Sequence, residues 1–467
     1  MRLFGNETFG TVRAESLFFL LFAADFRAAQ RGAVIYMLIP LIAFAVTYVL
    51  MILLPKVRHW VAACAAVFFI IWGGISGNGS PMTALPDAAG TINWNVLMML
   101  FGTMGTVYFF IASKMPDRMA ERILRIAPNT MWAVVLISLF SGFISAFMDN
   151  VATVLMIAPI GLAVAKQLKI SPVDMLICIS VSSNLQGAAT LVGDTTSIML
   201  GGYADMNFFE FFFLDGKFSI FWAVELGALA TVPVIMFLFR KQRSHVMIQS
   251  QTQVEDYVPS VLLLLNIVLL IGASFLPDLP ENINGYICLA IFAVTALYSL
   301  LRNRSAKQLV SALREIDFRT ILLLASLFII IGGVERAGIL DELARMIQSL
   351  GGGNLFAVYT IIVVASVLLS AFIDNIPYVA TMLPVIKSIA LAMGMTGVPY
   401  VLYFGLLSGA TLGGNITPIG ASANITAIGI LRKEGYEVKN SQFMRIGLPF
   451  TLVAVLVGYV YIWLIWA

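Results

Sequence analysis

The sequence SAFMDNVATVLMIAP at residues 145–159 returns almost unchanged as SAFIDNIPYVATMLP at residues 370–384. The two copies have the same length in a chain of 467 residues, and each ends in a proline, Pro159 or Pro384. In each copy a polar Asp-Asn pair interrupts two apolar stretches. The sequence therefore predicts an internal duplication, with a short break between two helices at the same place in each half.

A second pair of related stretches follows the Asp-Asn motifs. NLQGAATLVG at residues 184–193 corresponds to TLGGNITPIG at residues 411–420, at nearly the same spacing as the first pair. Both stretches lie in apolar runs long enough to be interrupted, at residues 174–200 and 398–430. Glycine and proline destabilise a helix interior by about 1 and 3 kcal/mol respectively. We therefore expect two broken helices in addition to the two hairpins.

The composition places the chain in a membrane. Hydrophobic residues make up 60% of the sequence and charged residues only 11%, whereas soluble domains carry roughly 25% charged residues. A soluble globule of this size would need a more polar surface. This excludes soluble enzymes, disordered chains and fibrous proteins, and the net charge of +3 indicates no nucleic-acid partner.

The apolar runs are continuous rather than alternating, which favours helices over the strands of a β-barrel. The sequence predicts an all-α polytopic membrane protein with two inverted repeats, about ten transmembrane helices, two re-entrant hairpins and two broken helices. The expected apolar helices are 34–54, 60–76, 94–112, 129–147, 151–166, 174–200, 218–239, 258–275, 285–301, 320–334, 355–373, 376–392, 398–430 and 447–466. Residues 113–126 have the pattern of an amphipathic helix on the membrane surface.

The basic residues indicate how the two halves are oriented. If each hairpin enters and leaves on one side, each half crosses the membrane an odd number of times and the second half is inverted. Matched loops should then lie on opposite sides: residues 77–93 contain no Lys or Arg, whereas residues 302–319 contain five. The positive-inside rule assigns the basic loops to the cytoplasm.

This orientation predicts four segments along the chain. They are an interfacial N-terminal arm (1–31), a first inverted repeat (32–239), a cytoplasmic linker (240–257) and a second inverted repeat (258–467). Arg27 and Arg31 of the arm are the exception to the positive-inside pattern, because they would precede the first span on the outer side.

Charged side chains inside a bilayer cost roughly 2.5–3.5 kcal/mol each on insertion scales, so those that remain are candidate functional groups. Asp149 and Asp374 each lie at a break where one helix ends and another begins. Free carbonyls at such a break can coordinate a cation, and free amides can bind an anion. An ordinary turn in water is the alternative, which the repetition of the whole hexapeptide disfavours.

The candidate ion- and substrate-binding residues are polar or glycine positions at the two hairpins and the two broken helices. They are Asp149, Asn150, Thr153, Asn184, Thr190, Gly193, Asp194, Thr195, Asp374, Asn375, Asn415, Thr417, Gly420, Ser422 and Asn424. Hydroxyls and amides suit a dehydrated ion or a small oxyanion, and small-residue helix packing is the alternative for the glycines. The two Asp-Asn pairs are candidate Na⁺ ligands.

Other features bear on the class of function. Glu225 lies inside an apolar run, has no counterpart in the other half, and is a candidate accessory proton site. No histidine lies within a span, which leaves no nucleophile–base pair, so no catalytic residue is assigned and a transporter is favoured over an enzyme. The pattern GxxxxGK[ST] does not occur, so neither ATP-driven pumping within this chain nor a cofactor is expected.

These motifs resemble the ion transporter superfamily. It includes the arsenite permease ArsB, the sodium/proton antiporter NhaD, the melanosomal P protein, citrate–metal symporters and INDY-type dicarboxylate/sodium symporters. The two hairpin sequences and GATLGGNITPIGASANITAIGI at residues 409–430 carry the resemblance, which covers roughly residues 34–466 and looks closest to the ArsB and P-protein branch. It implies hairpin tips near the membrane midplane, a homodimer, and movement of the hairpins and broken helices against a scaffold.

The hairpin tips depart from one branch of this superfamily. INDY-type members carry Ser-Asn-Thr at the tips, where Na⁺ and a substrate carboxylate bind. This sequence has Asp149-Asn150-Val151 and Asp374-Asn375-Ile376 instead. Carboxylates in place of hydroxyls favour a cation or proton role for the two aspartates.

Taken together, the sequence predicts an ion-coupled secondary active transporter in a bacterial plasma membrane. The coupling ion is expected to be H⁺ or Na⁺, and the mechanism to be alternating access. The expected solute is a small anion or metalloid oxyacid, such as arsenite, a carboxylate or an inorganic anion. A Na⁺/H⁺ antiporter is the alternative.

Overall fold

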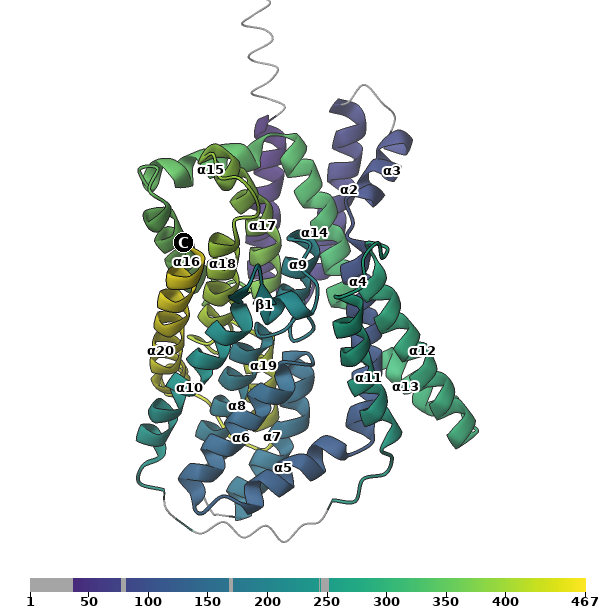
Figure 1. Cartoon of the computed structure of the whole chain (residues 1–467), viewed down its shortest axis with the longest axis vertical. Coiled ribbons are helices and arrows are strands. Elements are labelled where there is room, and N and C mark those ends of the chain that lie inside the picture. The colour runs from purple at the N-terminus through teal and green to yellow at the C-terminus, as the bar shows by residue number, and fades with distance from the viewer. Residues whose placement is uncertain (1–36, 77–80, 168–170, 243, 245–251) are drawn as a thin grey trace, which may run out of the picture.

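The computed structural model of the chain is almost entirely helical (Figure 1). It describes residues 37–467 without 77–80, 168–170, 243 and 245–251. The expected N-terminal arm therefore lies outside the described residues, as does part of the expected linker at 240–257.

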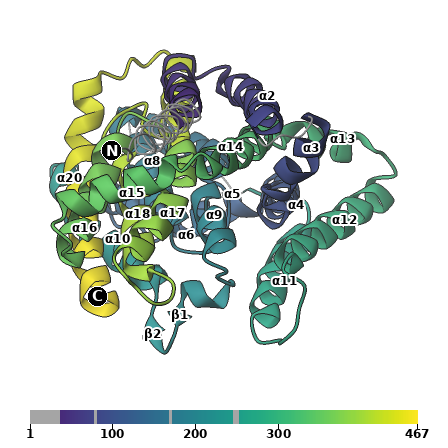
Figure 2. The same cartoon turned by 90° about the horizontal axis from the view of Figure 1, so that it is seen from above.

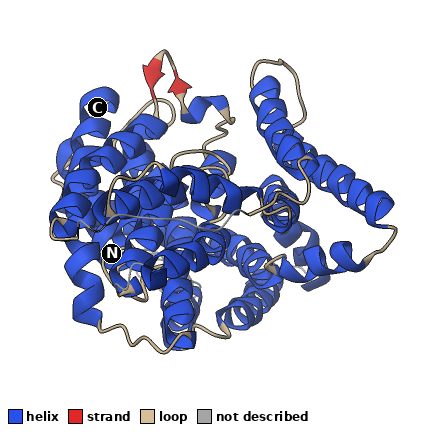
Figure 3. Cartoon of the chain, turned by 90° about the horizontal axis from the view of Figure 1, so that it is seen from below, coloured by secondary structure: helices blue, strands red, loops and turns tan. Residues whose placement is uncertain are grey.

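The first half consists of a helix at Met37–Leu53 and the elements α2 (Arg58–Ser76), α3 (Pro81–Gly90), α4 (Trp94–Ala112), α5 (Met115–Arg125), α6 (Thr130–Ser145), α7 (Asn150–Gln167), α8 (Pro172–Gly187), α9 (Thr195–Tyr203), η1 (Phe209–Phe211), β1 (Phe213–Leu214), β2 (Lys217–Phe218) and α10 (Ile220–Phe239). The two short strands pair antiparallel, with Phe213 opposite Phe218, and lie at the edge of the molecule (Figure 3).

The second half consists of α11 (Val258–Ala273), α12 (Ile283–Asn303), α13 (Lys307–Glu315), α14 (Phe318–Arg336), α15 (Ile339–Leu350), α16 (Leu355–Ser370), α17 (Asn375–Ala392), α18 (Tyr400–Gly413), α19 (Ser422–Lys433) and α20 (Asn440–Trp466). The apolar runs expected at 174–200 and 398–430 are indeed broken, into α8 and α9 and into α18 and α19.

The order of elements repeats along the chain. The helices α4 to α7 follow one another at nearly the same intervals as α14 to α17. The packing repeats as well, because α4 packs against α12 as α2 does against α14, and α6 packs against α8 as α16 does against α18. Figure 1 shows α5 and α15 at opposite ends of the long axis, as an inverted second half requires. The orientation of each half in a membrane stays a prediction.

Seven of the described helices are long and apolar enough to cross a membrane. The number is eight if α15 and α16, which meet at 114°, form one broken span. Further apolar helices, among them the hairpin helices α6 and α7, are shorter. The polytopic helical class is confirmed, whereas the count of about ten crossings stays a prediction.

Three helices, α3, α13 and α15, were not predicted from the sequence. α13 and α15 carry charged residues along one face, so they do not read as apolar spans. α3 contains Pro86 within its ten residues, which interrupts a helical pattern. The surface-type helix expected at 113–126 is present as α5, which carries Asp117 in its first turn and Arg122 and Arg125 in its last.

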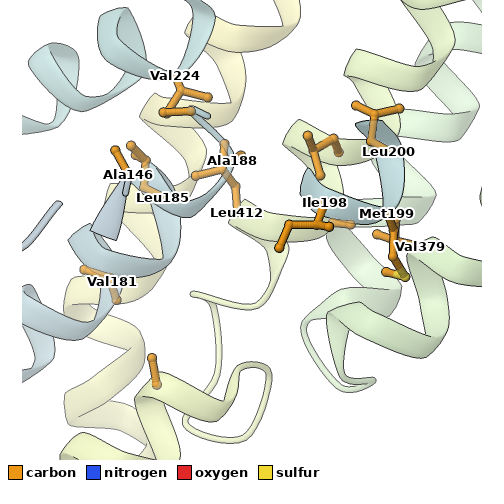
Figure 4. Packing of buried hydrophobic residues seen from close by; sticks show 14 of the residues in the cluster. Ala146, Val181, Leu185, Ala188, Ile198, Met199, Leu200, Val224, Val379 and Leu412 are labelled. Atoms are coloured by element: carbon orange, nitrogen blue, oxygen red, sulfur yellow. The ribbon is translucent and has the colours of Figure 1, made fainter. Parts of the chain in front are cut away.

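The centre of the fold is α8, in which every residue from Met175 to Gly187 is buried. Figure 4 shows Leu185 and Ala188 at its end beside Val224 of α10 and Leu412 of α18. Figure 2 shows α11 and α12 at the far edge from α16 and α20. The molecule therefore has a central bundle of hairpins and broken helices, which is flanked by an outer group of helices that includes α2, α4 and α14.

The inverted orientation can be tested by labelling two exposed positions. We expect a membrane-impermeant maleimide to label the Asp87→Cys variant from outside intact spheroplasts. The Ser305→Cys variant should react only after permeabilisation, because the basic loop that contains Ser305 is assigned to the cytoplasm. A Cys64→Ser background removes the exposed native cysteine. Labelling of both variants from the same side would contradict the inversion.

Candidate functional site

A cavity of about 440 Å³ lies where the hairpins and broken helices meet α2, α4 and α14. Eight of the predicted site residues line it, and they are Asp149, Asn150, Asn184, Asp194, Thr195, Asp374, Asn375 and Ser422. The two Asp-Asn motifs, one from each half of the sequence, therefore share one cavity. The other seven predicted residues do not line it, and most of them lie behind its wall, as described below.

Each hairpin turns at its Asp-Asn pair. The Oδ1 atom of Asp149 accepts hydrogen bonds from the backbone amides of Val151 and Ala152, at 3.0 and 3.1 Å. Asp374 is the N-cap of α17 and accepts a bond from the amide of Ile376 at 3.2 Å. Aspartate is a preferred N-cap because its oxygen satisfies free amides at the positive end of the helix. The two aspartates therefore start the second helix of each hairpin and also face the cavity.

Asp374 has a cationic partner that the sequence analysis missed. Nη1 of Arg58, the first residue of α2, lies 2.6 Å from Oδ2 of Asp374, and Oγ of Ser422 donates to the same oxygen at 3.3 Å. The Arg58 and Asp374 side chains are only 22% and 17% exposed. Arg58 lies in a short basic segment between two apolar runs, where it resembles an ordinary loop charge. No signal in the sequence links it to Asp374.

The asparagines of the two tips hold each hairpin together. Oδ1 of Asn150 accepts a hydrogen bond from Oγ of Ser145 at 2.7 Å. Oγ of Ser370 donates to Oδ1 of Asn375 at the same place in the second hairpin. Ser183 of α8 also donates to the backbone carbonyl of Asn150, at 3.2 Å. These bonds fix the tips in position beside the broken helices.

Two predicted threonines fasten the broken helices to the hairpins. Oγ1 of Thr190 donates to the backbone carbonyl of Ala146, and Oγ1 of Thr417 donates to that of Ala371. Both carbonyls belong to the last turn before a hairpin tip. Thr190 and Thr417 are buried, and they act on the backbone of the tips from behind the cavity wall.

Two predicted glycines allow the backbone segments on the two sides of each break to lie close together. A Cβ atom at Gly193 would lie 2.7 Å from the carbonyl oxygen of Gly187, and one at Gly420 would lie 2.6 Å from that of Gly414. Both distances are shorter than real Cβ contacts, and the opposing atoms are backbone. Glycine at these positions is therefore required by packing between the two sides of each break.

A buried amide network joins the two broken helices. Nδ2 of Asn184 donates to Oδ1 of Asn415 at 2.8 Å and to Oδ1 of Asn424 at 3.0 Å. Asn415 in turn donates to the backbone of Val181, and Asn424 to that of Gly414. Only Asn184 reaches the cavity, while Asn415 and Asn424 lie behind it. The network links the two halves of the chain at the site.

Asp194 begins the second part of the first broken helix. Its Oδ1 accepts a bond from the amide of Thr195 at 2.8 Å, and its Oδ2 accepts one from the hydroxyl of Thr196 at 2.9 Å. The residue is 9% exposed. The last predicted residue, Thr153, is buried on α7 outside the cavity lining, and its hydroxyl has no hydrogen-bond partner within the described residues.

Carboxylates outnumber cations on the cavity wall. The carboxylate residues are Asp149, Asp194, Glu315, Asp317 and Asp374, and Arg58 is the basic one. The formal charge is therefore −4 when all six are ionised. Glu315 and Asp317 are exposed as well as lining the cavity, so the cavity reaches the surface at the start of α14. This wall attracts cations and repels a bare anion.

A duplicated helical fold whose hairpins meet broken helices at a charged cavity defines a class, the polytopic membrane transporters. Comparison with known sequences identifies the family. The chain belongs to the citrate transporter family, CitMHS, whose sequence pattern matches residues 48–406. It is an integral, multi-pass membrane protein, and its bacterial relatives point to a plasma membrane.

Similar proteins are found both by sequence and by structure. An uncharacterized transporter of Mycobacterium tuberculosis is 30% identical over 80% of this chain and 86% of its own length. The human P protein is 24% identical over 79% of this chain, which spans about half of that protein, 53%. The transporter YdaH of Alcanivorax borkumensis shares the fold, with a TM-score of 0.56 and 13% identity over 80% of this chain and 85% of that one.

The close packing of the breaks can be tested with two glycines of the second broken helix. Gly420→Ala should lower the thermal stability of the purified protein, because overpacking against backbone costs about 1–3 kcal/mol. Gly429→Ala is the matched control, since a Cβ there meets nothing within 4 Å. Equal melting temperatures of the two variants in the same detergent would contradict the tight break.

Proposed function

We propose that the protein is an ion-coupled secondary active transporter that carries a small anion or a metalloid oxyacid by alternating access. The observation that carries this proposal is the meeting of both Asp-Asn tips and both broken helices at one cavity. Membership of the citrate transporter family supports a carboxylate as the first solute to test. Arsenite and inorganic anions are the other members of the proposed class.

The charges on the cavity wall give a physical reason for coupling. An anion at Arg58 would compete with Asp374 for the charge of the guanidinium, and the other carboxylates repel the anion. A proton or Na⁺ bound at Asp149 or Asp374 removes part of that repulsion. Cation binding and anion binding therefore favour each other, which is the thermodynamic basis of cotransport.

The cavity wall also suggests which parts move. α2, α4 and α14 of the outer group form one side of the cavity, and the hairpins and broken helices form the other. Arg58 and Asp374 are paired across this boundary. Movement of the central bundle against the outer helices would break that contact and carry the site to the other side of the membrane. In this proposal the protein is a homodimer that transports without catalysing a reaction, and H⁺ or Na⁺ is the coupling ion.

A Na⁺/H⁺ antiporter is the second candidate. The excess of carboxylates over the single guanidinium on the wall favours it, because such a wall binds cations without help from an anion. In this version Arg58 would act as a tethered cation that neutralises Asp374 in the absence of Na⁺. The two candidates differ in whether transport needs an added anion.

The tip aspartates can be tested by neutral substitution. Asp149→Asn and Asp374→Asn should each reduce transport in proteoliposomes to background while expression and monodispersity stay normal, because an amide neither binds a proton nor balances Na⁺. Glu281→Gln, at an exposed position, is the control carboxylate. Full activity in both variants would remove the proposed role of these carboxylates.

Arg58→Gln separates the two candidates. Uptake of radiolabelled citrate or arsenite by proteoliposomes should fall at least tenfold if Arg58 holds the anion, since a buried charged hydrogen bond contributes about 1.5–3 kcal/mol. A pH dye in the same vesicles reports Na⁺-evoked alkalinisation without any added anion. Wild-type alkalinisation that is independent of citrate and arsenite would support the exchanger and contradict anion transport.

A further inference from the structure

Glu225 is a carboxylate that the cavity does not use. It is the sixth residue of α10, a helix long and apolar enough to span a membrane, and its side chain is half-buried. Its partner is Gln186 of α8, whose Nε2 donates to Oε2 of Glu225 at 3.1 Å. Gln186 follows Asn184 by two positions, about 200° around a helix. Because Asn184 lines the cavity, Gln186 lies on the opposite face of α8, where it meets Glu225 of α10.

The hydrogen bonding of this pair is incomplete. Gln186 is 5% exposed, and within the described residues its Oε1 has no hydrogen-bond partner. A buried acceptor without a partner destabilises the folded state, because it loses its hydrogen bond to water and gains none. With the Glu225 carboxylate ionised, only the amide nitrogen of Gln186 can bond to it, so the oxygen stays unpaired. A protonated Glu225 would have an O–H to donate, and rotation of the carboxamide would let Oε1 accept it.

We propose that Glu225 and Gln186 form a proton-binding site in the membrane interior, separate from the cavity, and that it supplies H⁺ to the transport cycle. A proton from water binds to a carboxylate oxygen of Glu225 and forms an O–H bond. The carboxamide of Gln186 then turns so that Oε1 accepts this O–H. Release of the proton to water reverses both steps. The assignment to coupling rests on the proposed transport function, whereas proton binding itself does not.

The position of Gln186 connects this site to the broken helix. Its neighbour Gly187 ends α8, and the carbonyl of Gly187 accepts a hydrogen bond from Oγ of Ser197 at 3.0 Å. The absent Cβ of Gly187 leaves room for Asn150, whose Oδ1 would lie 2.5 Å from such an atom. A turn of the Gln186 amide therefore occurs one residue from the contact between the broken helix and the first hairpin tip.

The surroundings of Glu225 contain few other titratable groups. α6, α8 and α20 pack against α10. α6 carries no charged or titratable residue, α8 carries Asp174 and Cys178, and α20 carries Arg445, Tyr459 and Tyr461. Arg445 is paired with Asp174 at 2.7 Å, on the exposed end of both helices. Gln186 is the residue whose side chain is hydrogen-bonded to Glu225 within the described structure.

Infrared difference spectroscopy tests proton binding directly. The full-length protein in liposomes is titrated through a pH series, and the C=O stretch of protonated carboxyl groups is followed. We expect a band that appears on acidification in the wild type and is lost in Glu225→Gln, which keeps the size of the side chain but cannot bind the proton. Gln186→Leu should shift this band, and Glu437→Gln, an exposed carboxylate, should leave it unchanged. Glu225→Asp provides a second carboxyl variant in case the amide does not fold.

The coupling role is read separately in the same vesicles. Citrate and arsenite are tested as probes, and Glu225→Gln should lose proton-driven net uptake while it retains exchange of external for internal solute. Identical infrared titrations of the wild type and Glu225→Gln would overturn the proton site. Loss of the band with unchanged proton-driven uptake would overturn its role in coupling. A band without transport of any probe would support proton binding and count against the proposed transport function instead.

Discussion

Backbone that is not helical can lie at membrane depth only where other groups satisfy its hydrogen bonds. In this protein the two breaks and the two hairpins do this for each other. Thr190 bonds to the carbonyl of Ala146 on the first hairpin, and Thr417 bonds to that of Ala371 on the second. The approach of each broken helix to its hairpin depends on these bonds, because without them the carbonyls of Ala146 and Ala371 would lose a partner in an apolar environment.

The same constraint explains why the site is charged. Helix N-termini that meet at a tip leave free amides, and an aspartate is an efficient cap for them. Asp149, Asp194 and Asp374 are all such caps, and all three line the cavity. The carboxylates that cap the starts of these helices are thus also the groups that make the cavity attractive to cations. Helix capping and the proposed ion binding both require an aspartate at these three positions.

Much of this arrangement could be predicted from the sequence. The repeated hexapeptide predicted the position of both hairpins, and the glycines predicted the position of both breaks. Each motif contains residues that are unfavourable inside an apolar helix, and each recurs at a fixed spacing in the second half. Contacts between segments without a common motif could not be predicted. Arg58 lies far from Asp374 in the sequence, and the helices α3, α13 and α15 are too polar or too short to resemble spans. The cavity-lining residues that belong to the repeated motifs were predicted. Arg58 was not predicted, because it belongs to none of these motifs.

The two halves share the same order of helices but differ in the polar residues of their broken helices. When residues 184–194 are paired with residues 411–421, Gln186 corresponds to Gly413 and Asp194 to Ala421, so the first broken helix is the more polar of the two. Ala421 caps α19 without a side-chain bond, and it also lines the cavity. Arg58 is paired with Asp374 beside the second hairpin, whereas Asp149 and Asp194 of the first half have no ion-pair partner within the described residues. In the proposed cotransport a cation would bind at Asp149 and Asp194 and an anion at Arg58, so that the two ions bind side by side rather than in competition.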